Sequence, residues 1–415
     1  MYMKILLINH YAGSIYHGME FRPYYLSKEW VKMGHEVVIV AASFSHLRQK
    51  NIEMTAEIKE ENIDGIRYIW LKTPEYNGNG FGRIRNMLTF IRKLYSYLPK
   101  ITADFIPDAV IASSTYPLDS YPARWIAQKH GAKFVFELHD LWPMSPQVLG
   151  KMSKWHPFIM LMQMAEDYWC KNADVVISLL PDAHKHLVTR GMQMEKYFVI
   201  PNGVDLNEWT GEVEDIPETH KIFINQLKHE DKFLIAYTGG LVTSNTLHII
   251  IDIADKLRHN SSIYFLLIGK GPDQSRLEEK IAKLKLNNIS ILPPVPKKAV
   301  PSLFKKIDLF VRFSIAKELE QYGSSPNKIF DYMMSAKPVL WTYSAKDNWI
   351  DNAGCGFTFH EYDLDEVSGK IQEIYCMDKE RLSEMGKKGR DYIINNATYP
   401  ILAEKFIKAL GGDSK

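Results

Sequence analysis

The stretch YGSSPNKIFDYMMSAKPVLW, residues 322–341, gathers hydroxyl groups, a lysine and an acid at the start of one segment. Pro326 suits the first position of a helix, and Ser325 before it suits the N-cap. The helix start would present free amides and a positive dipole end, and Lys328 adds a full charge in the first turn. Asp331 lies on roughly the same face, where a carboxylate can bind a sugar diol. The pattern predicts a nucleotide site; the alternative is an ordinary capped helix with a surface lysine and aspartate.

Polar residues also follow two strand-like runs in the first half of the chain. Gly13 and Gly18 bracket a loop in NHYAGSIYHGMEFRP, residues 9–23, which lacks GxGxxG spacing and suits a loop that closes on a substrate. His139 ends a strand-like run in ELHDLWP, residues 137–143. A histidine at that place can contact a substrate or can be a satisfied structural residue.

Two glycines follow another strand-like run in YTGGLVTSN, residues 237–245. Gly239 and Gly240 allow the backbone to approach a ligand closely, although a tight turn is the simpler interpretation. No Ser-His-Asp order, metal-spaced His/Cys set or Walker lysine motif stands out in the sequence. These absences favour a reaction in which the protein only positions the reactants and stabilises a leaving group. Departure of a nucleoside diphosphate is one such reaction.

Length and composition indicate a folded protein of two domains. The chain has 415 residues, 46% of them hydrophobic and 24% charged, and a net charge of +2. A nearly neutral balance argues against nucleic acid as a partner. Three widely spaced cysteines predict a reducing compartment without disulfides or a zinc framework. The apolar runs are too short to span a bilayer, and a strand-like run begins at Lys4, so we expect no signal peptide and a cytoplasmic protein.

Short apolar runs alternate with helix-period segments along the chain. They are nearly continuous in Val, Ile and Leu, as in buried parallel strands. The first array comprises residues 4–10, 35–42, 65–72, 108–114, 133–140 and 174–180, and the second comprises residues 233–240, 262–271, 289–295, 308–314, 337–344 and 356–360. Two such arrays predict an α/β protein of two doubly wound, Rossmann-like domains with the active site in the cleft between them. We place the domains at residues 1–205 and 206–390, followed by a helix at 391–415 that returns to the first domain.

The motifs taken together resemble the retaining glycosyltransferases of family 4, which have the GT-B fold of two facing Rossmann-like domains. The resemblance is carried by IPNGVD, YTGG, LIGKGPDQSRLE and SSPNKIFDYMMSAKPV, and it runs over nearly the whole chain. YHGMEFRPYYLSKEW, DLWP and YGSSPNK are similar to N-acetyl-L-fucosamine transferases of bacterial O-antigen and capsule assembly. The resemblance implies retaining transfer of an N-acetylated or 6-deoxy hexose from a UDP-sugar to an undecaprenyl-diphosphate-linked glycan, with an acceptor-binding first domain and a donor-binding second domain.

The resemblance also implies which residues bind the donor. Asp331 would bind the ribose as the second acid of the family's Glu-x7-Glu motif, which leaves Gly323 where the first acid should stand. Glu320, three residues earlier, could supply that acid if the loop is longer here. Otherwise polar neighbours must replace it: Ser324, Ser325 and Asn327.

A second departure concerns the diphosphate. Gly240 and Asn245 stand where typical family members carry an arginine and a lysine. Lys328 is the first candidate to neutralise the diphosphate, and Lys270 and Arg312 are the further candidates.

By the same resemblance, His139 would contact the donor sugar or phosphate, and the leaving diphosphate would help to deprotonate the acceptor. No dedicated base, metal or other cofactor is then expected. Acceptor-side contacts are expected from the first glycine loop: Gly13, His17, Gly18 and Glu20. Two alternatives remain open, a nucleotide-sugar epimerase of the same fold and a non-catalytic nucleotide-sugar-binding partner.

A basic segment predicts contact with an anionic membrane. In FGRIRNMLTFIRKLYSYLPK, residues 81–100, apolar side chains follow helical spacing and five basic side chains occur without an acid. Such a helix can lie on anionic lipid at the cytoplasmic face of the bacterial cell membrane, which would bring a lipid-linked acceptor to the enzyme. The alternative is that its apolar stripe packs on the first domain's sheet.

Overall fold

The computed structural model describes residues 2–18, 21–78, 80–314, 317–345 and 347–412. The chain forms two compact units: unit 1 is Met1–Asn202 with Tyr399–Lys415, and unit 2 is Gly203–Thr398. The unit boundary lies close to the predicted residue 205. The return to unit 1 begins at Tyr399 and not at residue 391, because helix α16 (Lys379–Asn396) continues past that point and packs against α13 (Asn327–Met334) of unit 2.

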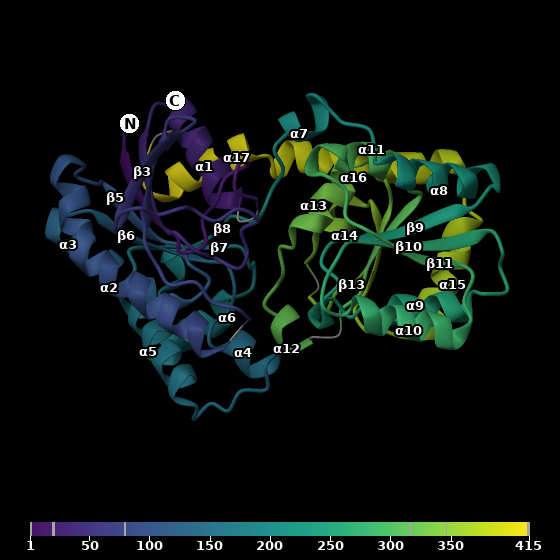
Figure 1. Cartoon of the computed structure of the whole chain (residues 1–415), viewed down its shortest axis with the longest axis horizontal. Helices are drawn as coiled ribbons and strands as arrows, with labels where there is room; N and C mark the ends of the chain where they lie inside the picture. The colour runs from purple at the N-terminus through teal and green to yellow at the C-terminus, as the bar shows by residue number, and fades with distance from the viewer. Residues whose placement is uncertain (1, 19–20, 79, 315–316, 346, 413–415) are drawn as a thin grey trace. The chain divides into compact units, whose positions relative to one another are not determined.

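Unit 1 is built on an eight-stranded sheet with the order β3-β4-β2-β1-β5-β6-β7-β8 (Figure 1). Strand β3 pairs antiparallel with β4, and the other neighbours pair in parallel. The strands are β1 (Lys4–Ile8), β2 (Glu36–Ala42), β3 (Ile58–Ile63), β4 (Ile66–Leu71), β5 (Ala109–Ala112), β6 (Lys133–Leu138), β7 (Val175–Ser178) and β8 (Tyr197–Val199). The strand order reverses between β1 and β5, so the carboxyl ends of these two strands form the switch point where ligands bind in open α/β sheets.

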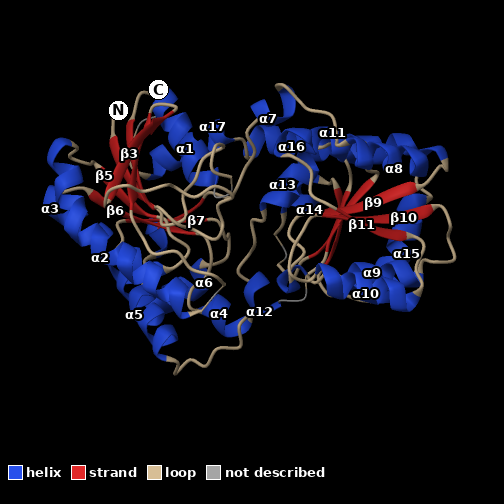
Figure 2. Ribbon diagram, viewed as in Figure 1, coloured by secondary structure: helices blue, strands red, loops and turns tan. Residues whose placement is uncertain are grey.

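Helices cover both faces of this sheet, which is why its strands are apolar on both sides. Helix α1 packs against α17 on one face, where the Trp30 and Phe406 rings lie 4.9 Å apart between centroids, while α2, α3 and α5 lie on the other (Figure 2). The helices of unit 1 are α1 (Phe21–Lys32), α2 (Phe81–Asp104), α3 (Ser120–His130), α4 (Met144–Val148), α5 (Pro157–Asn172), α6 (His184–Leu187) and α17 (Tyr399–Ala409).

Unit 2 has a six-stranded parallel sheet with the order β11-β10-β9-β12-β13-β14, and its switch point lies between β9 and β12. The strands are β9 (Phe233–Thr238), β10 (Ile263–Ile268), β11 (Ile289–Leu292), β12 (Leu309–Arg312), β13 (Val339–Thr342) and β14 (Gly356–Phe359). Besides α13 and α16, its helices are α7 (Asn207–Thr210), α8 (Glu218–His229), α9 (His248–Lys256), α10 (Gln274–Leu284), α11 (Val300–Lys305), α12 (Lys317–Glu320), α14 (Trp349–Ala353) and α15 (Leu364–Tyr375).

The predicted fold of two doubly wound α/β domains is confirmed, with a strand in each of the twelve predicted runs. Strands β3 and β8 were not predicted, because IKEENI is too polar and YFV too short to give a signal. The predicted N-cap at Ser325 is wrong. Pro326 occupies that position with extended torsion angles (φ −75°, ψ 126°), so helix α13 begins at Asn327. Among the described residues, no helix is long and apolar enough to cross a bilayer.

Candidate functional site

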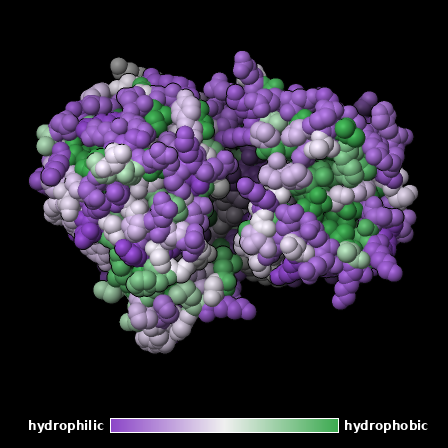
Figure 3. Space-filling view, in the orientation of Figure 1, coloured by the Kyte–Doolittle hydropathy of each residue, from purple (hydrophilic) through white to green (hydrophobic). Residues whose placement is uncertain are grey.

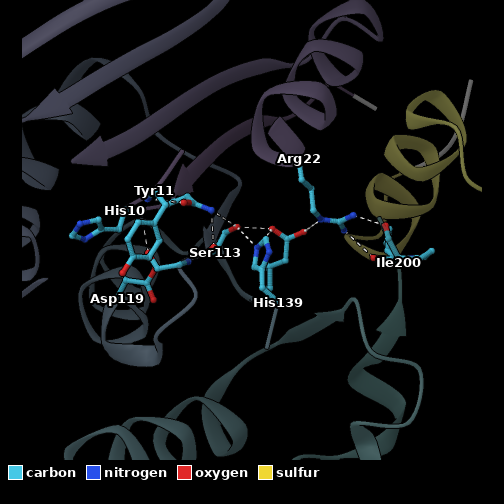
Figure 4. Close-up of polar contacts among 11 residues, drawn as sticks. His10, Tyr11, Arg22, Ser113, Asp119, His139 and Ile200 are labelled. Carbon is cyan, nitrogen blue, oxygen red and sulfur yellow. Dashed lines mark hydrogen bonds and ion pairs between the residues drawn. The ribbon is translucent and has the colours of Figure 1, made fainter. Parts of the chain in front are cut away.

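A buried ion pair organises the switch point of unit 1 (Figure 4). Glu137, in β6, is fully buried and accepts a 2.9 Å hydrogen bond from Arg22 Nε, at the start of α1. The Arg22 guanidinium also donates to the carbonyl oxygens of Ile200, at 2.9 Å, and Pro201. Burial by itself raises the pKa of the Glu137 carboxyl, but Arg22 and His139 lower it to about 2, so the group is a carboxylate at neutral pH.

The carboxylate and a serine hold the side chain of His139. Ser113 Oγ, after β5, donates to Glu137 Oε2 at 2.5 Å, and His139 Nε2 lies 3.0 Å from that hydroxyl and 3.3 Å from Glu137 Oε2. Because the Ser113 proton goes to Glu137, the hydroxyl oxygen and the carboxylate both face Nε2 as acceptors, so Nε2 carries a proton. Asn9 Nδ2 donates to Ser113 Oγ at 3.1 Å and fixes the serine in turn. This arrangement leaves Nδ1 as the ring nitrogen for a ligand.

Two further titratable groups lie beside this network and take little part in it. Asp119 is buried, accepts from the Ser114 backbone amide at 3.0 Å, and has its pKa raised to about 7 by burial. His10 Nδ1 lies 2.6 Å from Tyr116 Oη, and burial lowers the pKa of its imidazole well below the ordinary value. Both groups are thus held in neutral form more readily than in water.

The predicted acceptor-side residues lie in the loop after β1. The Gly13 carbonyl accepts a 2.8 Å hydrogen bond from Tyr68 Oη, and His17 Nδ1 lies 2.9 Å from Ser14 Oγ. Gly18 has φ +67°, a conformation that favours glycine. His17 and the β3–β4 turn line an open cavity of about 640 Å³. Glu20 lies outside the described residues.

In unit 2, Lys328 reaches the carboxyl end of β9 from the first turn of α13. Its Nζ donates to Tyr237 Oη at 2.8 Å and lies 4.6 Å from the centroid of that ring. Gly239, with φ +136°, lets the ammonium come close, since a Cβ there would lie 3.2 Å from Nζ. Burial, assisted by repulsion from Arg312, lowers the pKa of Lys328 to about 7.

Arg312, at the end of β12, and Glu320, in α12, form a loose buried pair. Arg312 Nη1 lies 3.8 Å from Glu320 Oε1, and neither atom has a hydrogen-bond partner among the described residues. The guanidinium lies 5.5 Å from the Trp341 ring centroid, and Ser344 Oγ donates to Glu320 Oε2 at 3.2 Å. Buried charged groups usually have hydrogen-bond partners. Because this pair lacks some of its partners within the described residues, it can bind a polar group of a ligand.

The remaining residues predicted to bind the donor differ in their burial and in their hydrogen bonds. Asn245 Nδ2 donates to the Gly240 carbonyl at 2.8 Å, so its amide holds the loop. Asp331 is half-buried, and burial raises the pKa of its carboxyl to about 7, with Lys297 opposing the rise. Ser324 is half-buried, Ser325 is buried, and Asn327 and Lys270 are exposed.

The structure thus brings Lys328 and Gly239 together and pairs Arg312 with Glu320. The sequence analysis predicted neither contact. Sequence reasoning missed the network that holds His139: Ser113 contacts the ring, Arg22 bonds Glu137, and Asn9 bonds Ser113. An arginine followed by proline at the start of a helix is a signal that could have pointed to a buried role for Arg22. Within the described ranges, no group of three or more His, Cys, Asp or Glu residues could hold a metal ion.

Comparison with known families divides the chain as the structure does. Residues 17–203 match the glycosyl transferase 4-like domain, and residues 218–392 match the glycosyl transferases group 1 family. The putative colanic acid biosynthesis glycosyl transferase WcaI of Escherichia coli (strain K12) is 23% identical over 288 residues, 68% of this chain and 69% of WcaI. A phosphatidylinositol N-acetylglucosaminyltransferase protein of Arabidopsis thaliana is 22% identical over 316 residues, 75% of this chain and 62% of the plant protein.

Solved structures share the fold over nearly the whole chain. A glycosyltransferase from Rickettsia africae ESF-5 has a TM-score of 0.68 at 18% identity and 98% coverage of both chains. Anabaena Alr3699/HepE in complex with UDP-glucose has a TM-score of 0.66 at 15% identity and 99% coverage of both chains. With a glycosyl transferase 4-like domain in its first half and a group 1 domain in its second, the chain belongs to the glycosyltransferases of the GT-B type.

Proposed function

We propose that this glycosyltransferase moves a sugar with retention from a UDP-sugar to a lipid-linked glycan, in the assembly of a bacterial surface polysaccharide such as O-antigen or capsule. The donor sugar is an N-acetylated or 6-deoxy hexose, with N-acetylfucosamine as the first candidate, and the acceptor is carried on undecaprenyl diphosphate. The name of the WcaI relative, which refers to colanic acid biosynthesis, and the UDP-glucose bound by HepE support this choice of pathway and donor.

The observation that carries the proposal is the incompletely compensated positive charge at the switch point of unit 2. Lys328 contacts a neutral tyrosine, and its neighbour Arg312 is 3.8 Å from the nearest carboxylate oxygen and has an unpartnered Nη1 among the described residues. Like charges gathered in a buried place favour an anion with several acceptor oxygens. A nucleoside diphosphate has that chemistry, and Asp331, on the same helix as Lys328, is the proposed ligand of its ribose.

In the proposed reaction, the bond between the sugar's anomeric carbon and the diphosphate oxygen breaks while the acceptor oxygen bonds to the same face of that carbon. The acceptor proton passes to the leaving diphosphate, so no protein base is needed. Lys328, once protonated, stabilises the charge that develops on the diphosphate. The carboxylate of Glu137 and the hydroxyl of Ser113 hold a proton on Nε2 of His139, so Nδ1 is the ring nitrogen that can contact the sugar or phosphate. The proposed reaction uses no metal or other cofactor. It takes place at the cytoplasmic face of the membrane.

A donor panel tests the proposal. Purified protein is incubated with UDP-linked N-acetylfucosamine, N-acetylglucosamine and glucose, each with and without an undecaprenyl-diphosphate-linked glycan, and the products are analysed by mass spectrometry and NMR. Acceptor-dependent product with the donor's anomeric configuration supports the proposal. An epimer formed from donor alone would identify an epimerase, and donor binding without any turnover would identify a binding partner.

A further inference from the structure

Large apolar side chains on the surface of unit 1 concentrate in one stretch. The sequence LGKMSKWHPFIMLMQM, residues 149–164, links α4 to α5 and covers the first half of α5. Trp155 is 70% exposed and Met164 63% exposed. Three further apolar side chains of the stretch are also exposed: Leu149, Met160 and Leu161. We call these five residues the apolar patch; single exposed apolar residues are normal, but several in one short stretch indicate a surface that another molecule covers.

Packing inside unit 1 does not explain these residues. The buried face of α5 is made by other side chains, among them Ile159, Met162 and Trp169. Met160, Leu161 and Met164 are exposed, so this half of the helix carries apolar side chains on its exposed face as well as on its buried face. In Figure 3, apolar residues gather at the lower end of unit 1, where Figure 1 places α5.

The charge of the stretch indicates what covers the patch. Residues 149–164 contain Lys151, Lys154 and His156 and no acid. Both lysines are exposed, and Lys154 Nζ lies 5.2 Å from the centroid of the Trp155 ring, so a cation and an interfacial aromatic stand together. Exposed tryptophan, methionine and leucine beside lysine fit the boundary between anionic headgroups and acyl chains.

The basic helix predicted to lie on the membrane packs much of its apolar stripe inside unit 1. In α2, Met87, Phe90 and Leu94 are buried in unit 1, which supports the alternative that its apolar stripe packs on the sheet. Lys93, one of its basic residues, is also buried and bonds Glu57 at 2.5 Å. The exposed face of α2 keeps its arginines together with Phe81, Leu88 and Tyr95, while much of its apolar stripe packs in the core.

We propose that the apolar patch, flanked by Lys151 and Lys154, is the surface by which unit 1 docks on an anionic lipid bilayer. The inference rests on the proposed function, because a lipid-linked acceptor requires the enzyme to work at a membrane. The patch begins ten residues after His139 in the chain and within the same unit. Docking through it anchors to the membrane the unit that carries the His139 network.

Vesicle sedimentation tests the surface without any donor or acceptor. Vesicles of phosphatidylcholine and phosphatidylglycerol in equal amounts should sediment the parent protein, and vesicles of phosphatidylcholine alone should sediment much less. Trp155→Ser with Met164→Ser, and separately Lys151→Gln with Lys154→Gln, should each weaken binding about tenfold. The matched control on α2, Leu88→Ser with Arg85→Gln and Arg92→Gln, should bind like the parent. A parent that fails to sediment, or patch variants that bind as well as it does, would overturn the proposal.

A conservative variant identifies the inserted side chain. Trp155→Phe should bind vesicles like the parent, while quenching of tryptophan fluorescence by lipids with brominated acyl chains should fall sharply. Undiminished quenching in Trp155→Phe would overturn the assignment of the patch. The proposed function is tested by donor binding and sugar transfer, and the docking surface is tested by vesicle binding. The failure of one proposal can therefore be distinguished from the failure of the other.

Discussion

The two polar clusters differ in how completely the protein itself satisfies them. In unit 1, the buried Glu137 carboxylate receives hydrogen bonds from Arg22 and Ser113 and contacts His139, so its charge is compensated. In unit 2, Lys328 bonds a neutral phenol, and the nearest atoms of Arg312 and Glu320 lie 3.8 Å apart without hydrogen-bond partners in the described part of the chain.

This difference indicates two ways of using buried charge. A satisfied network fixes geometry before any ligand arrives, so damage to it should appear first as lost stability. An unsatisfied cluster raises the free energy of the ligand-free protein, and an anion removes that cost by binding. Damage there should appear as lost affinity with little loss of stability.

The largest effect is expected at Glu137. Glu137→Ala leaves the Arg22 guanidinium buried without its carboxylate, so the free energy of unfolding should fall by about 3–5 kcal/mol, measured by urea denaturation. The control is the exposed pair of Arg67 and Glu60 in the same unit, where Glu60→Ala should cost less than about 1 kcal/mol. Equal losses at the two sites would mean that the unit 1 network does not behave as a buried one.

His139→Ala separates positioning from stability within unit 1. Glu137 keeps its bonds to Arg22 and Ser113 in this variant, so the free energy of unfolding should change by less than about 1 kcal/mol. Transfer should fall about a hundredfold if His139 contacts the donor in the transition state. A large drop in melting temperature, with residual activity that follows the folded fraction, would instead assign His139 a structural role.

The same contrast explains which features the sequence predicts. The parallel strands were predictable because continuous apolar runs such as KILLI are buried on both faces. The glycine turn at Gly239 and the lysine at Lys328 were predictable individually as features of strand and helix ends. Their contact joins residues 89 positions apart, and no local pattern reports such a contact.

The unit 1 network was harder to predict for the same physical reason. The network joins Arg22 of α1, Ser113 after the end of β5, and Glu137 of β6. These residues meet only because the sheet order places β5 beside β6 and because α1 packs over the sheet. The burial of Lys93 was hidden in a basic helix, where a lysine is usually solvated.

In unit 2, Lys328→Met should weaken binding of a UDP-sugar by about tenfold to a hundredfold, because a charge-assisted hydrogen bond is lost. Stability without ligand should stay constant or rise, since a buried cation is removed. Calorimetry and urea denaturation measure the two quantities. The exposed Lys270 provides the comparison, and Lys270→Met should weaken binding less. A destabilised Lys328→Met that binds donor normally would contradict the contrast between the units.

Asp331→Ala should weaken UDP-sugar binding about tenfold through loss of the hydrogen bonds to the ribose, with the fold intact. Comparison of UDP with its 2′,3′-dideoxy analogue provides the control, because the variant should lose the preference for the ribose diol and keep affinity for the analogue. Equal loss for both ligands would remove Asp331 from the ribose site.

The smallest effect, and the most specific to unit 2, is a pH dependence. Lys328 has a pKa of about 7 in the ligand-free protein, so most of it is neutral at pH 8. Diphosphate oxygens favour the ammonium form and raise this pKa, so binding takes up a proton. Affinity for UDP-glucose, whose diphosphate does not titrate in this range, should therefore fall as the pH rises above 7.

The stability of the ligand-free protein should change in the opposite direction. Between the lowered pKa of Lys328 and its ordinary value, the unfolded chain binds more protons than the folded one, so Lys328 makes the free energy of unfolding rise with pH. Asp331, with its pKa raised to about 7, destabilises the fold progressively up to that pH and adds little slope above it. Calorimetry at pH 8 in two buffers of different ionisation enthalpy should show proton uptake by the parent and none by Lys328→Arg, whose guanidinium stays charged. Equal uptake by both proteins would place the titrating group elsewhere and leave Lys328 without its proposed role at the diphosphate.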